Sequence, residues 1–183
     1  MPRIPYPEIA ALPQKLQDFQ ARLDPNVNIF RMLPWAETMV EPWHRLGHAI
    51  LQRGKLDPVL REMAILRVGH LCRAPYEVHA HERIGARAGM PPEKITALAE
   101  GAEAPVFSEL EKLVIRFSDE VVRNVKASDA TFDALARHLS HREMVELVLT
   151  IGYYQMTCAF LENFEIPIEA PGAIDDPFRK RQG

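Results

Sequence analysis

The sequence predicts an all-α protein. Prolines or capping residues recur where helices would begin, and glycines recur where they would end. Apolar residues repeat at helical spacing, and no segment shows the convincing apolar–polar alternation of a strand. The chain of 183 residues is 47% hydrophobic and 26% charged, which is typical of a globular protein with a sizeable core. We therefore expect one domain, spanning residues 1–183.

The N-terminal part is punctuated by prolines. Residues 1–30 are expected to form a Pro-rich arm that contains a short helix over about 13–23. Residues 26–33 are predicted to be a connecting segment. A longer helix is predicted over about 35–52, and Pro42 inside it predicts a kink or a break.

The clearest boundaries lie in the middle of the chain. Asp57 is a good N-cap and Pro58 a good first helical residue. The helix that follows is apolar over most of its surface, which indicates a central helix. It should end near residue 73, because Pro75 disfavours helical geometry at Ala74. A second helix is then predicted over about 75–88.

Four further helices and a tail complete the predicted fold. Two of these helices open with a capping box, which pairs Ser108 with Glu111 and Ser140 with Glu143. The predicted helices cover about 90–101, 108–124, 128–139 and 140–164. Residues 167–183 are rich in turn residues and charge, so we expect an extended tail that packs on a neighbour or is mobile.

The charge distribution, the hydrophobicity and the cysteines limit the expected binding partners and cellular location. The net charge of −3 comes from interspersed acids and bases, which gives no reason to expect nucleic acid or an anionic membrane as a partner. No apolar run reaches the roughly 18–20 residues that span a bilayer, and the N-terminus lacks the apolar region of a signal peptide. Cys72 and Cys158 are far apart and form no metal or redox motif. We expect a cytoplasmic protein with two reduced thiols.

The residues that indicate chemistry lie between Glu62 and His81. Glu77 and His81 are four residues apart and share one face of the second helix, whereas His79 points roughly 200° away from Glu77. A carboxylate on the mostly apolar preceding helix is costly unless it is paired. We therefore expect the proline turn between the helices to bring Glu62 close to Glu77 and His81.

This pattern resembles the carboxymuconolactone decarboxylase/alkylhydroperoxidase-like (AhpD-like) family. Peroxidase members of that family carry a glutamate, a Cys-x-x-Cys pair and a histidine four residues after the second cysteine. On this chain those positions fall on Glu62, Ala74, Glu77 and His81. Other segments that look like the family are 28–31, 57–62, 88–91, 117–120, 128–132 and 142–147. The resemblance implies an AhpD-like helical bundle that assembles as a dimer, trimer or hexamer.

The chain departs from both branches of the family. A thiol peroxidase needs a thiolate nucleophile and a resolving thiol, and Ala74 and Glu77 supply neither. Cys72 lies two residues too early and on the far side of Pro75 from the histidine. The decarboxylase branch shares the Glu-x-x-x-His spacing, but it does not require an acid at the Glu62 position.

Two carboxylates beside an imidazole form a plausible acid–base set. The resemblance then implies a cofactor-independent lyase that acts on a small carboxylated lactone or a related intermediate of aromatic catabolism. The catalytic candidates are Glu62, Glu77 and His81. The substrate-binding candidates are Tyr76, Arg67 and Arg73.

Other interpretations remain open at this point. The chain could be an alkylhydroperoxidase-like antioxidant protein, or a non-catalytic protein that binds a small molecule or acts as a scaffold. Glu77 and His81 could be an ordinary helix pair that contributes about 0.2–0.5 kcal/mol. A metal site is disfavoured because His79 lies on the wrong face of the helix. We expect no cofactor, a small-molecule substrate and self-association.

Overall fold

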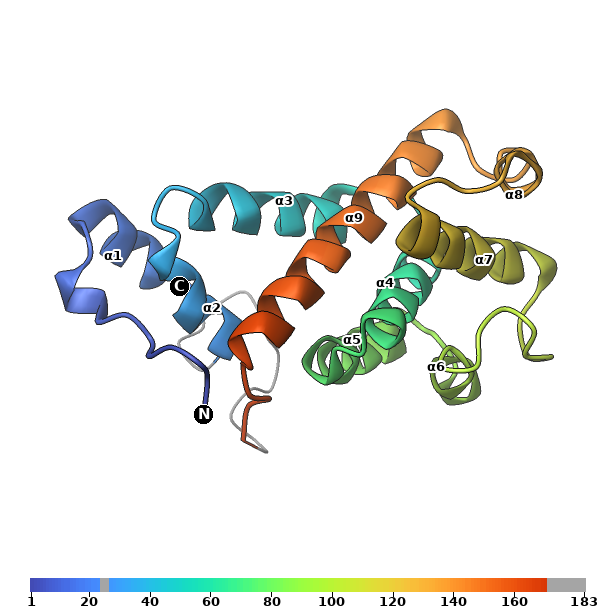
Figure 1. The fold of residues 1–183 in the computed structure, drawn as a ribbon. Coiled ribbons are helices and arrows are strands. Elements are labelled where there is room, and N and C mark those ends of the chain that lie inside the picture. Colours follow the sequence, from blue (N-terminus) through green and yellow to red (C-terminus); the bar gives the residue numbers. More distant parts are fainter. Residues whose placement is uncertain (24–26, 171–183) are drawn as a thin grey trace. The chain divides into compact units, whose positions relative to one another are not determined.

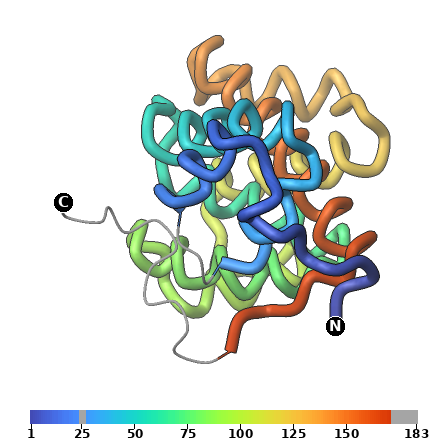
Figure 2. Tube along the Cα trace, turned by 90° about the vertical axis from the view of Figure 1, so that its left-hand side faces the viewer, coloured from blue at the N-terminus to red at the C-terminus, as the bar shows by residue number. Residues whose placement is uncertain are grey.

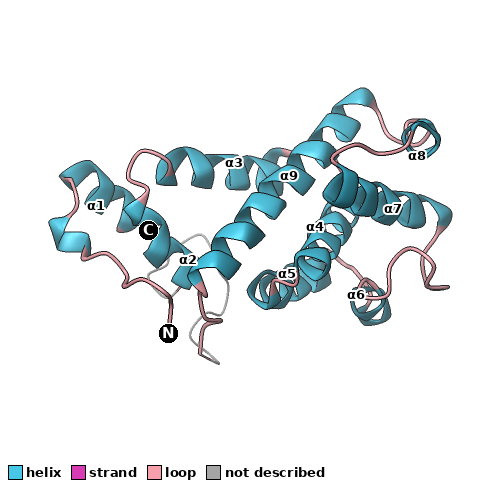
Figure 3. Ribbon diagram, in the orientation of Figure 1, coloured by secondary structure: helices cyan, strands magenta, loops and turns pink. Residues whose placement is uncertain are grey.

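The computed structural model describes residues 1–23 and 27–170, and this part of the chain contains helices and loops but no strand (Figure 3). The all-α prediction is confirmed. The helices labelled in Figure 1 are α1 Gln14–Gln20, α2 Asn28–Met32, α3 Val40–Arg53, α4 Pro58–Cys72, α5 Pro75–Arg87, α6 Pro92–Ala97, α7 Glu109–Asn124, α8 Asp129–Leu135 and α9 His141–Phe164. Short 3-10 helices cover Ile9–Ala11 and Leu33–Trp35.

The described residues group into two compact units. One comprises those within Met1–Leu46 and Leu161–Gly183, and the other comprises Gly47–Phe160. All three catalytic candidates belong to the second unit. The single domain expected over 1–183 remains a prediction.

In the first unit, α1 lies within the helix predicted at 13–23. The connecting segment predicted at 26–33 is wrong for its described part, because α2 forms there. The buried residues of α2 are Asn28, Ile29, Phe30 and Met32. Five residues are too few to show a helical repeat, and Val27 makes no side-chain cap. Burial rather than a local signal stabilises this helix.

Helix α3 begins at Val40 rather than near residue 35. Pro42 is its third residue, where a backbone N–H would have no partner within the helix. The proline therefore costs no hydrogen bond, and it marks the start of α3 instead of a kink inside it.

The first part of the predicted tail is packed within the first unit. Asn28 donates from its backbone N to Glu169 Oε1 at 2.7 Å and from its side-chain Nδ2 to the carbonyl of Pro167 at 2.9 Å. Near the same end, Arg3 Nε donates to Glu165 Oε1 at 2.8 Å. The rest of the predicted tail, residues 171–183, lies outside the described residues.

In the second unit, α4 is the central helix and packs against α5 and α7 (Figure 1). Asp57 caps it by accepting from the backbone N–H groups of Val59 and Leu60 at 2.8 and 3.1 Å. The ten consecutive residues from Leu60 to Gly69 are buried. Arg73 ends the helix in the left-handed conformation, with φ 54°. The predicted start, end and burial of this helix are confirmed.

Helices α4 and α5 approach closely, and the chain doubles back between them (Figure 2). A Cβ atom on Gly69 would lie 3.0 Å from Val78 Cγ2, and one on Gly85 would lie 3.7 Å from the Cβ of Glu62. The two close approaches pair the end of α4 with the start of α5, and the first half of α4 with the end of α5. Glu62 is thereby placed beside α5.

The helices after α5 also begin where the sequence predicts. Both capping boxes are present, with Ser108 paired to Glu111 and Ser140 paired to Glu143. Helix α9 is the one helix among the described residues whose length and composition would allow it to cross a membrane, and half of its most apolar window is buried. A helix in the core of a globular protein can have the same length and composition.

Candidate functional site

His81 lies between two carboxylates in the second unit. Its Nδ1 is 2.6 Å from Glu62 Oε2 on α4, and its Nε2 is 3.0 Å from Glu77 Oε1, one turn earlier on α5. The three side chains are at most 4% exposed. The structure therefore brings together the three residues that the sequence singles out, and we call them the Glu–His–Glu cluster.

Arg61 extends the cluster by a fourth charged group. Its Nε donates to Glu62 Oε1 at 3.0 Å, its Nη2 lies 2.9 Å from the same oxygen in an ion pair, and its side chain is only 10% exposed. Buried charges are tolerated when they are paired and hydrogen-bonded. Helical spacing does not predict this contact, because adjacent residues on a helix do not normally face each other.

The two carboxylates more than offset the lowering of the His81 pKa by burial. Burial by itself lowers the pKa of His81, but the charges and hydrogen bonds of Glu62 and Glu77 raise that pKa from 6.5 to about 9. The imidazole is therefore protonated at neutral pH. Each of its N–H groups can then donate to one carboxylate.

Helix α9 covers the cluster with aromatic rings. The Tyr154 ring lies edge-on to His81, with centroids 4.9 Å apart, and Tyr153 packs edge-on against Tyr154 at 5.2 Å. Burial, followed by the charge of Glu77, raises the phenol pKa of both tyrosines. Both phenols are therefore neutral around the imidazole. They lie far from the cluster in sequence, so no local pattern could have indicated this contact.

The substrate-binding candidate Arg67 lies in a different buried cluster. Its Nε and Nη2 bind the two carboxylate oxygens of Asp119 at 2.5 and 3.0 Å. Its Nη1 donates to the carbonyls of Leu98 and Ala99 at 2.9 and 3.1 Å. The guanidinium thus joins α4 to α7 and to the turn after α6, and it is not among the groups that meet at His81.

The other two substrate-binding candidates differ in exposure. Arg73 is exposed at the C-terminal end of α4. Tyr76 is 6% exposed, in the first turn of α5, next to Glu77 in sequence.

The positions of the two family cysteines contain no sulfur. Ala74 is fully buried before the first residue of α5, and Glu77 points its carboxylate at the imidazole. Cys72 and Cys158 form no disulfide. Within the described ranges no group of three His, Cys, Asp or Glu side chains is arranged to hold a metal ion.

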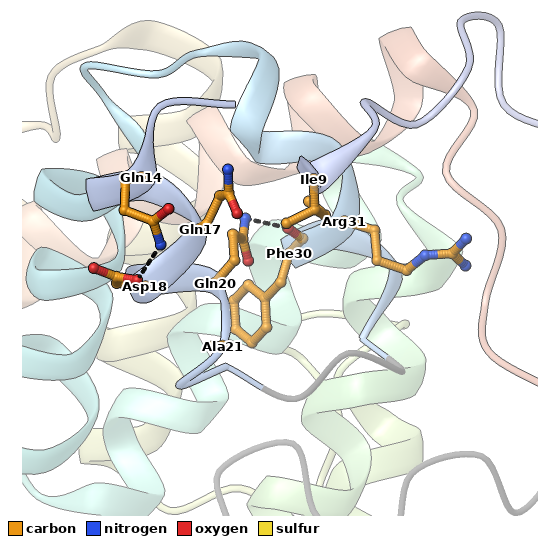
Figure 4. A pocket seen from close by; sticks show the side chains of 8 residues that line it. All are labelled: Ile9, Gln14, Gln17, Asp18, Gln20, Ala21, Phe30 and Arg31. Carbon is orange, nitrogen blue, oxygen red and sulfur yellow. Dashed lines mark hydrogen bonds between the residues drawn. The ribbon is translucent and has the colours of Figure 1, made fainter. Parts of the chain in front are cut away.

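A hollow of about 570 Å³ lies in the first unit and involves none of the predicted site residues. Several of its polar groups are already bonded, because Gln17 donates to the carbonyl of Leu12 at 2.8 Å and Gln20 to that of Phe30 at 3.0 Å. Figure 4 shows the Arg31 guanidinium turned away from the other lining side chains. It lies instead 4.0 Å from the centre of the Tyr6 ring. The hollow therefore presents no converging set of charged groups.

Comparison with known sequences identifies similar proteins. Residues 37–120 match the model of the carboxymuconolactone decarboxylase family, a stretch that contains the whole Glu–His–Glu cluster. Protein YnjA of Escherichia coli (strain K12) is 27% identical over 120 residues, which are 64% of this chain. This chain spans 65% of the length of that relative.

Comparison with solved structures shows the fold. The AhpD core of a peroxidase-related protein from Ralstonia eutropha JMP134 aligns with a TM-score of 0.80 and 16% identity over 98% of both chains. The debrominase Bmp8, as a cysteine-to-alanine variant with 2,3,4-tribromopyrrole, aligns with a TM-score of 0.71 and 16% identity over 86% of this chain and 87% of its own. The AhpD-like fold predicted for this chain is thereby confirmed.

Proposed function

We propose that the protein is a cofactor-independent lyase, because residues 37–120 match the model of the carboxymuconolactone decarboxylase family. Its proposed substrate is a small carboxylated lactone or a related intermediate of aromatic catabolism. The observation that carries the proposal is the imidazole of His81, held between Glu62 and Glu77 with its pKa raised to about 9.

The proposed reaction needs charge stabilisation and one proton. When the bond between a ring carbon and the substrate carboxylate breaks, carbon dioxide leaves and the electron pair remains on the ring as an enolate. A protonated imidazole stabilises that negative charge and supplies the proton that the carbon takes up. Solvent then returns one proton to the cluster, so the reaction consumes one proton for each carbon dioxide released.

The cluster assigns a separate task to each carboxylate. Glu62 binds Nδ1 at 2.6 Å and fixes the orientation of the ring. Glu77 faces Nε2 at 3.0 Å, so it can receive the imidazole proton or hold the ring while the proton is transferred to substrate. The neutral ring of Tyr154 packs against His81 and helps to exclude water.

The structural neighbours support a small ring as ligand. The debrominase with a similar fold was crystallised with a brominated pyrrole. That ligand and a carboxylated lactone are both single five-membered rings.

The direct test measures carbon dioxide release from carboxymuconolactone by the purified protein. We expect His81→Asn to lower kcat about 10²–10⁴-fold, the usual contribution of general acid–base catalysis. His79→Asn is the matched control, because His79 is exposed on the same helix; it should leave the rate unchanged. Failure of the wild type to release carbon dioxide, or an active His81→Asn variant, would contradict the proposal.

Burial of the cluster favours a second candidate, a non-catalytic binding or scaffold protein. Side chains that are at most 4% exposed can serve as a purely structural ion network. In that case Glu62→Gln and His81→Ala would lower stability and leave the cellular role of the folded protein intact. The hydroperoxidase alternative is supported by the peroxidase-related neighbour, but the thiol positions Ala74 and Glu77 do not support its mechanism.

We also propose that α9 mediates self-association. Its exposed apolar side chains follow helical spacing and are 43–59% exposed: Val145, Val148, Leu149 and Met156. An apolar helix face of this kind commonly marks an interaction site. Light scattering after size-exclusion chromatography should show an oligomer for the wild type and a smaller species for Leu149→Glu. A monomeric wild type would contradict this proposal.

A further inference from the structure

We propose that Arg61 is a positioning residue that keeps Glu62 in its ionised form and leaves Glu77 as the carboxylate that exchanges protons with His81. The catalytic consequence of this inference rests on the lyase activity proposed above. The protonation pattern itself can be measured without any substrate.

The two carboxylates of the cluster differ in their charged contacts. Glu62 accepts one hydrogen bond from Arg61 Nε on Oε1, with Nη2 of the same guanidinium at 2.9 Å in an ion pair, and contacts His81 through Oε2 at 2.6 Å. The contact of Glu77 with the imidazole is longer, at 3.0 Å. Hydrogen bonds from charged donors favour the ionised form of a carboxyl group. The guanidinium and the imidazole thus hold the Glu62 carboxylate through both of its oxygens.

The burial of the Arg61 side chain indicates that its contact with Glu62 is specific. Successive residues on an α-helix point about 100° apart, so helical spacing alone does not bring Arg61 to Glu62. A buried guanidinium is costly unless its donors are satisfied, and this side chain is only 10% exposed. Its pairing with Glu62 offsets that cost.

Four charged groups are linked around His81. Glu62 contacts the imidazole from α4 and binds Arg61 through its other oxygen, Glu77 contacts it from its own helix, and Tyr154 packs on it from α9 with Tyr153 behind. The tyrosines are neutral, because burial and Glu77 raise the pKa of both phenols. Arg61, Glu62, protonated His81 and Glu77 then alternate in sign and sum to zero.

Removal of the guanidinium would leave one uncompensated negative charge in a buried site. Burial disfavours that charge, so the cluster should take up a proton. Glu62 would lose its hydrogen bond and its ion pair with the guanidinium and become the preferred place for that proton. The extra proton would then sit on the Nδ1 side of the imidazole, away from Glu77.

The test follows the glutamate carboxyl carbons by ¹³C NMR between about pH 5 and about pH 9, a range over which a buried carboxyl that gains a proton would titrate. Glu62→Gln identifies the signal of Glu62. In the wild type this signal should stay at the carboxylate position, and in Arg61→Met it should move to the protonated position. Arg61→Gln, also neutral but able to donate, gives the same readout if the methionine variant does not fold.

Two controls separate charge from packing. Arg61→Lys keeps the positive charge and should keep Glu62 ionised. Arg116→Met removes an arginine from an exposed pair with Glu103 and should change nothing. In kinetic assays Arg61→Met should lower kcat at least about tenfold with little change in KM, and Arg61→Lys should restore part of that loss.

The outcomes distinguish this inference from the proposed function. An unmoved Glu62 signal in the neutral variants would overturn the role of Arg61, whatever the activity of the protein. A moved signal in a protein that releases no carbon dioxide would support the role of Arg61 while the lyase proposal fails.

Discussion

Helix α4 carries two ion clusters that differ in burial and in chemistry. At Arg67, a guanidinium is satisfied by both oxygens of Asp119 and by two main-chain carbonyls. At Glu62, a carboxylate binds an imidazole whose pKa is raised to about 9. The first cluster contains a cation that stays protonated in proteins, so it has no proton to exchange near neutrality. The second cluster has an exchangeable proton, on the imidazole of His81.

This difference shows that a buried charge alone does not identify a functional site. The Arg67 side chain is 7% exposed and its partner Asp119 18%, and both clusters join α4 to a neighbouring helix. The distinguishing feature is a group that titrates and is held by carboxylates on both sides. Substitutions at the two clusters should therefore have different effects, on catalysis at one and on folding at the other.

The largest expected effect is on catalysis. Glu77→Gln removes the carboxylate that faces Nε2 of His81, so kcat for carbon dioxide release should fall about 10²–10⁴-fold. Asp119→Asn, at the other cluster, should keep the rate per folded molecule. Equal losses of activity from the two variants would remove the distinction between the clusters.

The next largest effect is on stability at the other cluster. Arg67→Met removes the guanidinium that binds Asp119 and two carbonyls, and the exposed Arg123, 3.8 Å from Asp119, replaces it only in part, so the unfolding free energy should fall by about 3 kcal/mol. Urea denaturation at pH 7 measures this loss. The exposed-pair variant Arg116→Met should change stability by at most about 1 kcal/mol. A mild effect of Arg67→Met would show that this cluster is not structural.

A smaller effect is expected in the pH dependence of stability. The folded-state pKa of His81 lies above its unfolded value, so its stabilisation is complete below about pH 6.5 and is lost as pH rises through about 9. At about 1.4 kcal/mol per unit of pKa shift, the unfolding free energy should fall by about 3 kcal/mol across that window. His81→Asn should abolish this contribution, as denaturant titrations at several pH values would show. A slope that persists unchanged in that variant would assign the effect to other groups.

The smallest expected effect concerns the thiols. Cys72 and Cys158 form no disulfide, and neither occupies a family cysteine position. Turnover of an organic hydroperoxide with dithiothreitol should therefore stay at background, and Cys72→Ser should leave it there. Cysteine-dependent turnover by the wild type would instead favour the hydroperoxidase alternative.

The sequence predicted the fold well where local signals are strong. Asp57, Ser108 and Ser140 marked helix starts because capping is a short-range interaction. Helix α2 was missed because burial stabilises it and its five residues carry no cap or repeat. Pro42 was placed inside a helix because the sequence does not show where the preceding 3-10 turn ends.

The cluster could be anticipated only in part. The spacing of Glu77 and His81 and the cost of an unpaired Glu62 predicted their proximity. Arg67 was included because it is near in sequence, although five residues place it about 140° around the helix from Glu62. Arg61 and Tyr154 were missed because the first contact depends on a side-chain bend and the second on packing against a distant helix.

The most direct test of the account is an NMR titration of the His81 imidazole in the wild-type protein, assigned with His81→Asn. We expect an imidazole that is still protonated at about pH 8 and titrates near pH 9. A titration midpoint at or below 6.5 would contradict it, because the two carboxylates would then not hold the proton on which the proposed chemistry depends.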